Sequence, residues 1–371
     1  NSLRKGGGKT YHSVTGSFCP IDWHLHKANP SKYPMFRELI AQSKHCKPNK
    51  VELDLREITK KARLYDAKNT KAVKSLRLSG VAFHETRCGS TLVANLLAAM
   101  KPHHHRVYSE SAPPAAVLRA CEGDEACDPI KQDTLLKDVL YMMGRSSNPV
   151  ETNVFYKFQS VTVKSNHVFT RNFPQIPWIF VYRDSVEIMM SHLGKHLEET
   201  ERAVCLRNMK KPPPDTRRII KEQGHTPSDL TAVEHCAAHL ASLCQAAIDE
   251  YISSPEKGQF VNYRTLPDIM WETILPKHFD LDVGDADIEN MKKVSQVYSK
   301  GFKGDILWED DTKRKQERAT NGIKEAADLF LKPRFDKMEK YNEGGAAAAA
   351  AGGLVEEEEE EEAATEKPED R

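Results

Sequence analysis

The chain has 371 residues with a formal net charge of zero, and 39% of its residues are hydrophobic and 29% charged. This is enough apolar material for one large α/β domain with a buried core, plus appendages. Residues 344–371 hold ten acidic and two basic residues, which leaves 52 basic and 44 acidic residues in the rest of the chain. This basic body suits an anionic ligand, or it has a basic surface without a specific partner. The chain has no apolar run of about eighteen residues or more, which excludes a membrane span in this sequence.

Residues 1–75 are polar and largely irregular, with one possible helix over 34–43, and we expect them to form an N-terminal extension. From Arg77 onward, apolar segments typical of buried strands alternate with segments of helical period. The expected strands cover 78–83, 106–109, 153–158, 177–182 and 258–263, the expected helices cover 91–100, 134–143, 185–193 and 229–252, and the chain then stays mainly helical to 341.

This alternation predicts a three-layer α/β/α fold with a central parallel sheet over residues 76–341. A polar insertion over about 195–228 contains the loop-forming segment KKPPPD at 210–215. The Ala/Gly/Glu-rich tail over 342–371 is predicted to be disordered, because it has no means of burying a core. Ligands of such sheets bind beyond the carboxyl ends of the strands. We therefore expect a ligand site among the residues just after Phe83, Ser109, Phe158 and Tyr182.

A candidate phosphate-binding loop follows the first expected strand of the domain. The sequence Arg87-Cys88-Gly89-Ser90-Thr91 leads from the strand directly into a helix, whose N-terminal N–H groups and partial positive charge favour anions. The glycine allows close backbone approach, the two hydroxyls add donors, and the arginine supplies a planar cation. A Walker A loop would place lysine where Ser90 stands, so a nucleoside triphosphatase or kinase is disfavoured. The alternative is an ordinary strand-to-helix turn capped by Ser90.

A second candidate anion site lies at the end of the strand expected over 177–182. Arg183 follows this strand, and Ser191 lies eight residues further along the next helix. An arginine at a strand end can bind a phosphate with two parallel hydrogen bonds, and a serine two turns along the helix can donate from the same side. Taken alone, the pair would more often be a surface turn followed by a helical serine.

Together these two motifs resemble the PAPS-dependent sulfotransferases, which bind 3′-phosphoadenylyl sulfate (PAPS). Arg87 to Thr91 look like the R-x-G-S-[ST] form of the 5′-phosphosulfate loop, closest to the carbohydrate-type and bacterial branch. Arg183 and Ser191 match the spacing of the family's 3′-phosphate motif. The resemblance covers about 76–341, leaves the extension and the insertion unexplained, and implies a P-loop nucleoside-triphosphate-hydrolase-like fold. It also implies transfer of a sulfuryl group to a hydroxyl or amine, without a metal.

A third segment, Lys300-Gly301-Phe302-Lys303-Gly304-Asp305, resembles the family's C-terminal K-G-x-x-G-D segment, which closes over the 3′-phosphate. This similarity implies a binding role for Lys300 and Gly301. Two departures weaken it, because Ser299 stands at the place of the usual arginine and Ile306 at that of the usual tryptophan. A flexible Gly-Lys loop is the alternative interpretation.

Sulfuryl transfer requires a general base for the acceptor proton, and Glu110 is the favoured candidate. It follows the strand expected over 106–109, and carbohydrate-type sulfotransferases carry a glutamate at the matching place. Capping of the next helix is its alternative role. His84 and the histidines at 103–105 are alternative candidates for the base. Lys157 could assist the leaving group, or it could be a structural lysine at the edge of the core.

The acceptor is expected to be a small molecule or a glycan, and its identity cannot be read from loops that vary freely on one fold. A catalytically inactive nucleotide-binding module is the alternative function. The sequence contains no motif for nucleic-acid binding.

Asn1 in place of methionine suggests a fragment or a processed form. Cys121 and Cys127 could pair in an oxidising compartment or remain reduced thiols, so cytoplasmic and Golgi-luminal locations both stay open.

Overall fold

The computed structural model describes residues 14–124, 126–194, 203–299, 306–307 and 309–343. Its centre is a five-stranded sheet in the order β5-β7-β4-β8-β9, in which every neighbouring pair is parallel. The strands are β4 (Arg77–His84), β5 (His105–Ser109), β7 (Asn153–Lys157), β8 (Trp178–Tyr182) and β9 (Gly258–Asn262). The predicted α/β fold class with a central parallel sheet is therefore confirmed, and each expected strand is present to within one or two residues at its ends.

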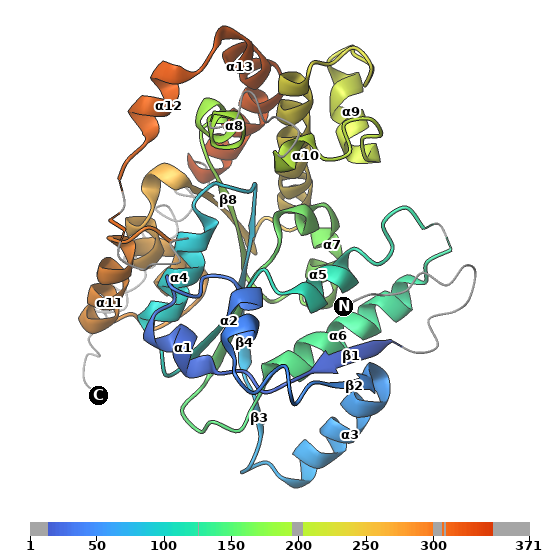
Figure 1. Ribbon diagram of the computed structural model, residues 1–371, viewed down its shortest axis with the longest axis vertical. Helices are drawn as coiled ribbons and strands as arrows, with labels where there is room; N and C mark the ends of the chain where they lie inside the picture. The colour runs from blue at the N-terminus through green and yellow to red at the C-terminus, as the bar shows by residue number, and fades with distance from the viewer. Residues whose placement is uncertain (1–13, 125, 195–202, 300–305, 308, 344–371) are drawn as a thin grey trace, which may run out of the picture.

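Helices cover both faces of this sheet. On one side α4 (Ser90–Met100) packs against α11 (Asp285–Ser295), while α7 (Asn166–Asn172) and α10 (Ala232–Ser253) lie on the other (Figure 1). Because both faces are covered, the strands consist of nearly continuous apolar residues rather than an alternating pattern. Phe83 and Phe155 are fully buried, and the Phe83 ring contacts Phe169 of α7 with ring centroids 6.2 Å apart.

The remaining helices around the sheet follow local signals in the sequence. A capping box formed by Thr231 and Glu234 starts α10, and Asp184 caps α8 by accepting from two backbone N–H groups. These helices are α5 (Ala112–Leu118), α6 (Pro129–Gly144), α8 (Ser185–Leu193), η1 (Ser160–Ser165), η4 (Tyr263–Thr265) and η5 (Met270–His278). After them come α12 (Thr312–Arg318), α13 (Asn321–Ala326), η6 (Ala327–Leu331) and a helical segment over 332–343.

The N-terminal extension contains more regular structure than its polar sequence suggests. Its elements are β1 (Thr15–Phe18), α1 (Trp23–Ala28), α2 (Phe36–Gln42), β2 (Val51–Asp54), α3 (Leu55–Lys68) and β3 (Lys74–Ser75). β1 and β2 pair with each other, and β3 pairs with β6 (Arg145–Ser146). Trp23 lies edge-on to Tyr108 of β5 at 5.0 Å, and Lys27 forms a 2.6 Å ion pair with the buried Glu151. Aromatic packing and a buried ion pair thus attach the extension to the domain.

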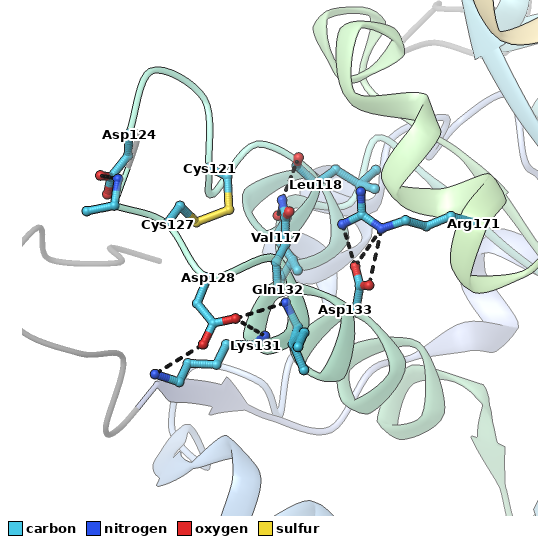
Figure 2. Close-up of a disulfide and its surroundings, with 12 residues drawn as sticks. Val117, Leu118, Cys121, Asp124, Cys127, Asp128, Lys131, Gln132, Asp133 and Arg171 are labelled. Carbon is cyan, nitrogen blue, oxygen red and sulfur yellow. Dashed lines mark hydrogen bonds and ion pairs between the residues drawn. A yellow bond between two sulfur atoms is a disulfide. The ribbon is translucent and has the colours of Figure 1, made fainter.

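Six of the cysteines form disulfides, which join Cys19 to Cys46, Cys121 to Cys127, and Cys205 to Cys236. Figure 2 shows the Cys121–Cys127 bond in the loop between α5 and α6, beside the Asp128 cap of α6. The pairing anticipated for these two cysteines is present, and the other two bridges are additional findings.

The part of the insertion that the structure describes contains η3 (Val204–Leu206) and α9 (Pro214–Glu222). The loop expected over 210–215 therefore passes into a helix at Pro214, since proline suits a first helical turn. The predicted tail lies outside the described residues from 344 onward. No helix in the described part of the chain is long and apolar enough to cross a membrane.

Candidate functional site

The loop between β4 and α4 has the backbone shape that an anion site requires. Thr86, Arg87 and Gly89 have φ angles of 85°, 54° and 85°, so three residues adopt the left-handed conformation within one turn. Two of them are not glycine, and such conformations cluster where a ligand or close packing maintains them. The turn ends at Gly89, the N-cap of α4, so that the N-terminal N–H groups of the helix face the loop.

The side chains of this loop divide into buried and exposed groups. Arg87 is exposed and makes no ion pair among the described residues, whereas Ser90 and Thr91 are 4% and 2% exposed. The Thr91 hydroxyl is buried and has no hydrogen-bond partner in the described part of the chain. Because a buried polar atom normally has a partner, this hydroxyl fits a site that receives a polar ligand. The loop thus offers a free cation and an unused hydroxyl.

Cys88 is the apolar member of the loop. Its thiol donates to the Val181 carbonyl at 3.0 Å, and burial raises its pKa to about 11. A thiol in this state is neither a nucleophile nor a metal ligand. The Cys88 thiol therefore anchors the loop to β8, and the role of Cys88 in the nucleotide-binding loop stays a prediction.

Tyr263 joins the loop to the second anion motif. A Cβ atom at Gly89 would lie 2.4 Å from Tyr263 Cδ2, so only glycine allows this ring to pack on the turn. The Arg183 guanidinium forms a cation–π contact with the same ring, and its Cζ lies 4.1 Å from the ring centroid. Tyr263 directly follows β9, which places it at the carboxyl edge of the sheet with the other site residues.

Arg183 and Ser191 lie on the same side of α8 and are linked through other residues. Arg183 is 5% exposed, donates from Nε to Glu187 Oε2 at 2.7 Å, and donates from Nη2 to Asp311 Oδ1 at 2.6 Å. The Ser191 hydroxyl donates to the Glu187 carbonyl at 2.8 Å and accepts from Lys315 Nζ at 2.7 Å. The predicted pair is thus brought together, in contact with two residues of the C-terminal segment.

One cavity joins the two motifs. Its volume is about 130 Å³, and among the residues that line it are Arg87, Gly89, Ser90, Thr91, Arg183, Ser191, Tyr263, Asp311 and Lys315. A larger cavity of about 450 Å³ is lined by Lys164 and by parts of α9 and α10, and by none of the predicted site residues. Lys300 and Gly301 lie outside the described residues, although the preceding Ser299 lines the smaller cavity. Seven of the nine predicted nucleotide-binding residues therefore lie in the described part of the chain, and all of these except Cys88 line the smaller cavity.

Glu110 directly follows β5, which is separated from β4 by β7 in the sheet, and it has a φ of 52°. Its backbone N–H donates to the Lys157 carbonyl at 2.7 Å, and its carboxylate accepts a hydrogen bond from Lys157 Nζ. Lys157 is fully buried, and burial lowers its pKa while the adjacent Glu110 carboxylate raises it again. Glu110 does not line the cavity of the two anion motifs, although it lies at the same edge of the sheet.

Of the histidines proposed as alternative bases, His84 lies beside Glu110, with its Nε2 3.9 Å from Glu110 Oε1, whereas the run at 103–105 lies away from it. His84 Nδ1 accepts from the Thr86 N–H at 3.1 Å, which leaves the ring proton on Nε2, 3.0 Å from the Phe158 carbonyl oxygen. His105 opens β5 and is buried, and burial lowers its pKa to about 4. His103 and His104 precede this strand, at the sheet edge opposite to Glu110. A parallel strand places its two ends on opposite edges, which removes this run from the site.

Glu85 is a buried acid beneath both motifs. Its carboxyl accepts from the Arg183 backbone N–H at 3.2 Å, and burial raises its pKa to about 8, partly opposed by that hydrogen bond. It links the end of β4 to the end of β8.

Sequence reasoning missed Glu85, Tyr263, Asp311 and Lys315. For Tyr263 a signal existed, because it follows the last apolar strand just as Arg183 follows β8.

No family model matches the chain. No curated protein matches it either. Among solved structures, a sulfotransferase from Alicyclobacillus acidocaldarius is similar at 12% identity and a TM-score of 0.38, covering 72% of this chain and 96% of that one. Sulfotransferase STF9 from Mycobacterium avium is similar at 11% identity and a TM-score of 0.37, covering 84% of this chain and 87% of that one. At such values the function has to be inferred from the residues of the site.

Proposed function

We propose that this chain is a sulfotransferase that takes a sulfuryl group from 3′-phosphoadenylyl sulfate and transfers it to a hydroxyl or amine. The observation that carries the proposal is the single cavity shared by the Arg87 loop and the pair Arg183 and Ser191. Two anion motifs on the neighbouring strands β4 and β8 suit a ligand with two separate anionic groups. The Thr91 hydroxyl, which has no hydrogen-bond partner among the residues that the structure describes, supports the same conclusion.

Each part of the site then has a role toward the donor. The N–H groups at the start of α4, Arg87, Ser90 and Thr91 bind the phosphosulfate, and Cys88 and Gly89 give the loop its shape. Arg183 and Ser191 bind the 3′-phosphate, together with Lys300 and Gly301 as the resemblance implies. No metal is needed, because fixed cations and N–H groups stabilise the negative charge that develops on the leaving group.

Glu110 is proposed as the general base. The acceptor oxygen or nitrogen attacks sulfur, and its proton passes to the Glu110 carboxylate as the new bond to sulfur forms. The bond between sulfur and the bridging phosphate oxygen breaks, and adenosine 3′,5′-bisphosphate leaves. Lys157 holds the Glu110 carboxylate through their ion pair and so fixes the direction from which the proton is taken.

The N-terminal extension is proposed to shape the acceptor side, where a small molecule or glycan would bind. Ser109, immediately before Glu110, donates from its hydroxyl to Met35 Sδ at 3.6 Å, at the start of α2. Cys19 and Cys46 tie the ends of the segment that carries α1 and α2. Three disulfides favour an oxidising compartment over the reducing cytosol.

A catalytically inactive nucleotide-binding module is the second candidate, and one observation favours it. The Glu110 carboxylate forms an ion pair with the fully buried Lys157, so an acceptor group would have to compete with that ammonium for the carboxylate. A transfer assay with sulfate-labelled donor and pooled sugars, sterols, phenols and amines decides between the two. An enzyme labels at least one acceptor pool in a manner that depends on Glu110, whereas an inactive module binds the nucleotide and labels none.

A further inference from the structure

A continuous polar chain connects Arg183 to Ser191 through two residues that sequence reasoning did not include. Asp311 accepts from Arg183 Nη2 at 2.6 Å through one oxygen and lies 2.9 Å from Lys315 Nζ through the other. Lys315 Nζ also donates to Ser191 Oγ at 2.7 Å. Both proposed 3′-phosphate ligands are thus joined to the same carboxylate and ammonium pair.

The position of Lys315 is fixed by the way in which α12 docks on α8. Gln316 donates to Asp184 Oδ1 at 2.8 Å, and the Thr312 hydroxyl donates to Glu187 Oε2 at 3.3 Å. These contacts hold the ammonium of Lys315, whose side chain is 13% exposed, against the Ser191 hydroxyl. Lys315 therefore supplies a cation to this site from a helix that is docked on α8.

In the described part of the chain, the Arg183 guanidinium donates hydrogen bonds to two carboxylates, Glu187 and Asp311, which differ in their freedom to move away. Glu187 is fully buried and also contacts Arg264 at 3.3 Å, so it stays with the arginine as a permanent partner. The Asp311 side chain is 28% exposed and can turn toward solvent. A bound phosphate would need the Arg183 and Lys315 donors that Asp311 occupies. Its negative charge would also repel the Asp311 carboxylate.

The size of the cavity leads to the same conclusion. Its volume of about 130 Å³ is well below the roughly 300–1,000 Å³ of pockets that hold small organic ligands. Asp311 and Lys315 are part of its lining. Entry of a nucleotide therefore requires lining groups to move, and of these two Asp311 is the more exposed.

We propose that Lys315 binds the 3′-phosphate of the nucleotide together with Arg183 and Ser191, and that Asp311 is a placeholder carboxylate which this phosphate displaces. The inference rests on the proposed function and adds one ligand and one competitor to its nucleotide site. The competing explanation is that Asp311 and Lys315 only fasten α12 to α8. Under that explanation, loss of either residue affects all nucleotides alike.

The test is calorimetric titration with adenosine 3′,5′-bisphosphate and with adenosine 5′-monophosphate, which lacks the 3′-phosphate. Lys315→Met should weaken binding of the bisphosphate by about 10–100-fold, the usual value of a charged hydrogen bond, and change binding of the monophosphate little. Asp311→Asn should tighten binding of the bisphosphate, because it removes the competing charge. Lys313→Met is the matched control, since that side chain is 90% exposed on the same helix.

The double variant Asp311→Asn/Lys315→Met removes both charges and guards against a folding defect caused by an unpaired buried charge. It should bind the bisphosphate more weakly than Asp311→Asn alone. Equal losses for both nucleotides in Lys315→Met, or weaker bisphosphate binding in Asp311→Asn, would overturn the inference. If the wild type itself shows no preference for the bisphosphate, the proposed function fails as well, and the two failures are therefore distinguishable.

Discussion

Glu110 and Lys157 form an ion pair across the carboxyl edge of the sheet, although they belong to different strands and lie 47 residues apart. The parallel register brings them together, because Ser109 of β5 lies opposite Lys157 of β7 and Glu110 is the next residue. The pair joins a fully buried ammonium to a carboxylate that is 20% exposed. The carboxylate end of the pair therefore reaches solvent, where we propose that the acceptor binds.

We expect Glu110→Gln to reduce turnover by about 10²–10⁴-fold, the usual contribution of a general base. Donor binding should stay within about twofold of the wild type, because Glu110 does not line the nucleotide cavity. Single-turnover transfer and calorimetric donor binding measure the two effects, and retained binding also shows that the variant is folded. Glu256→Gln, at an exposed position before β9, is the control. Transfer by Glu110→Gln at the wild-type rate would rule out Glu110 as the base.

Glu85 should make stability depend on pH. Its carboxyl ionises near the usual 4.5 in the unfolded chain but near 8 in the folded protein, where burial favours the neutral acid. The stabilisation is therefore complete below about pH 4.5 and is lost as the pH rises toward 8, with a slope of at most about 1.4 kcal/mol per pH unit. The free energy of unfolding can be measured in urea for the wild type and for Glu85→Gln. Raising the pH from 5 to 8 should lower the stability of the wild type relative to the variant. A difference that is independent of pH would contradict this assignment.

The three disulfides should contribute unequally to stability. Cys19 and Cys46 close a sequence separation of 27 residues, and Cys121 and Cys127 one of 6. The cost of removing a bridge grows with loop length, from about 2 kcal/mol for the short loop to roughly 3–4 kcal/mol for the long one. Calorimetric melting of the two double Cys→Ser variants measures this order. A larger loss from the short loop would show that chain entropy does not explain the difference.

The apolar parts of the fold could be predicted because their sequences have one dominant pattern. Segments such as NVFYKF and PWIFVY are typical of buried strands, and the alternation of strands with helices favours a parallel sheet. Since ligands meet the carboxyl edge of such a sheet, Arg87, Glu110 and Arg183 could be proposed together. The structure places all three at that edge.

The remainder depends on tertiary contacts that have no local signal. The helix of Asp311 and Lys315 has the sequence TKRKQER, whose charges show no apolar face, and only docking on α8 decides which lysine meets Ser191. The short strands of the extension pair with partners up to about seventy residues away. Disulfide connectivity likewise cannot be read from cysteine positions alone, which is why Cys19–Cys46 was not foreseen.

The most direct measurement of the nucleotide assignment is calorimetric titration of adenosine 3′,5′-bisphosphate into wild type, Arg87→Ala, Arg87→Lys and Arg183→Ala. Arg56→Ala, at an exposed arginine in the extension, is the control. Wild type and control should bind one equivalent with equal affinity, and each alanine variant at the site should bind at least about tenfold more weakly, since each loses a charged hydrogen bond to an anion. Arg87→Lys should fall between wild type and Arg87→Ala. Absence of binding by the wild type, or wild-type affinity in both Arg87→Ala and Arg183→Ala, would contradict the assignment of this cavity to a nucleotide with two anionic groups.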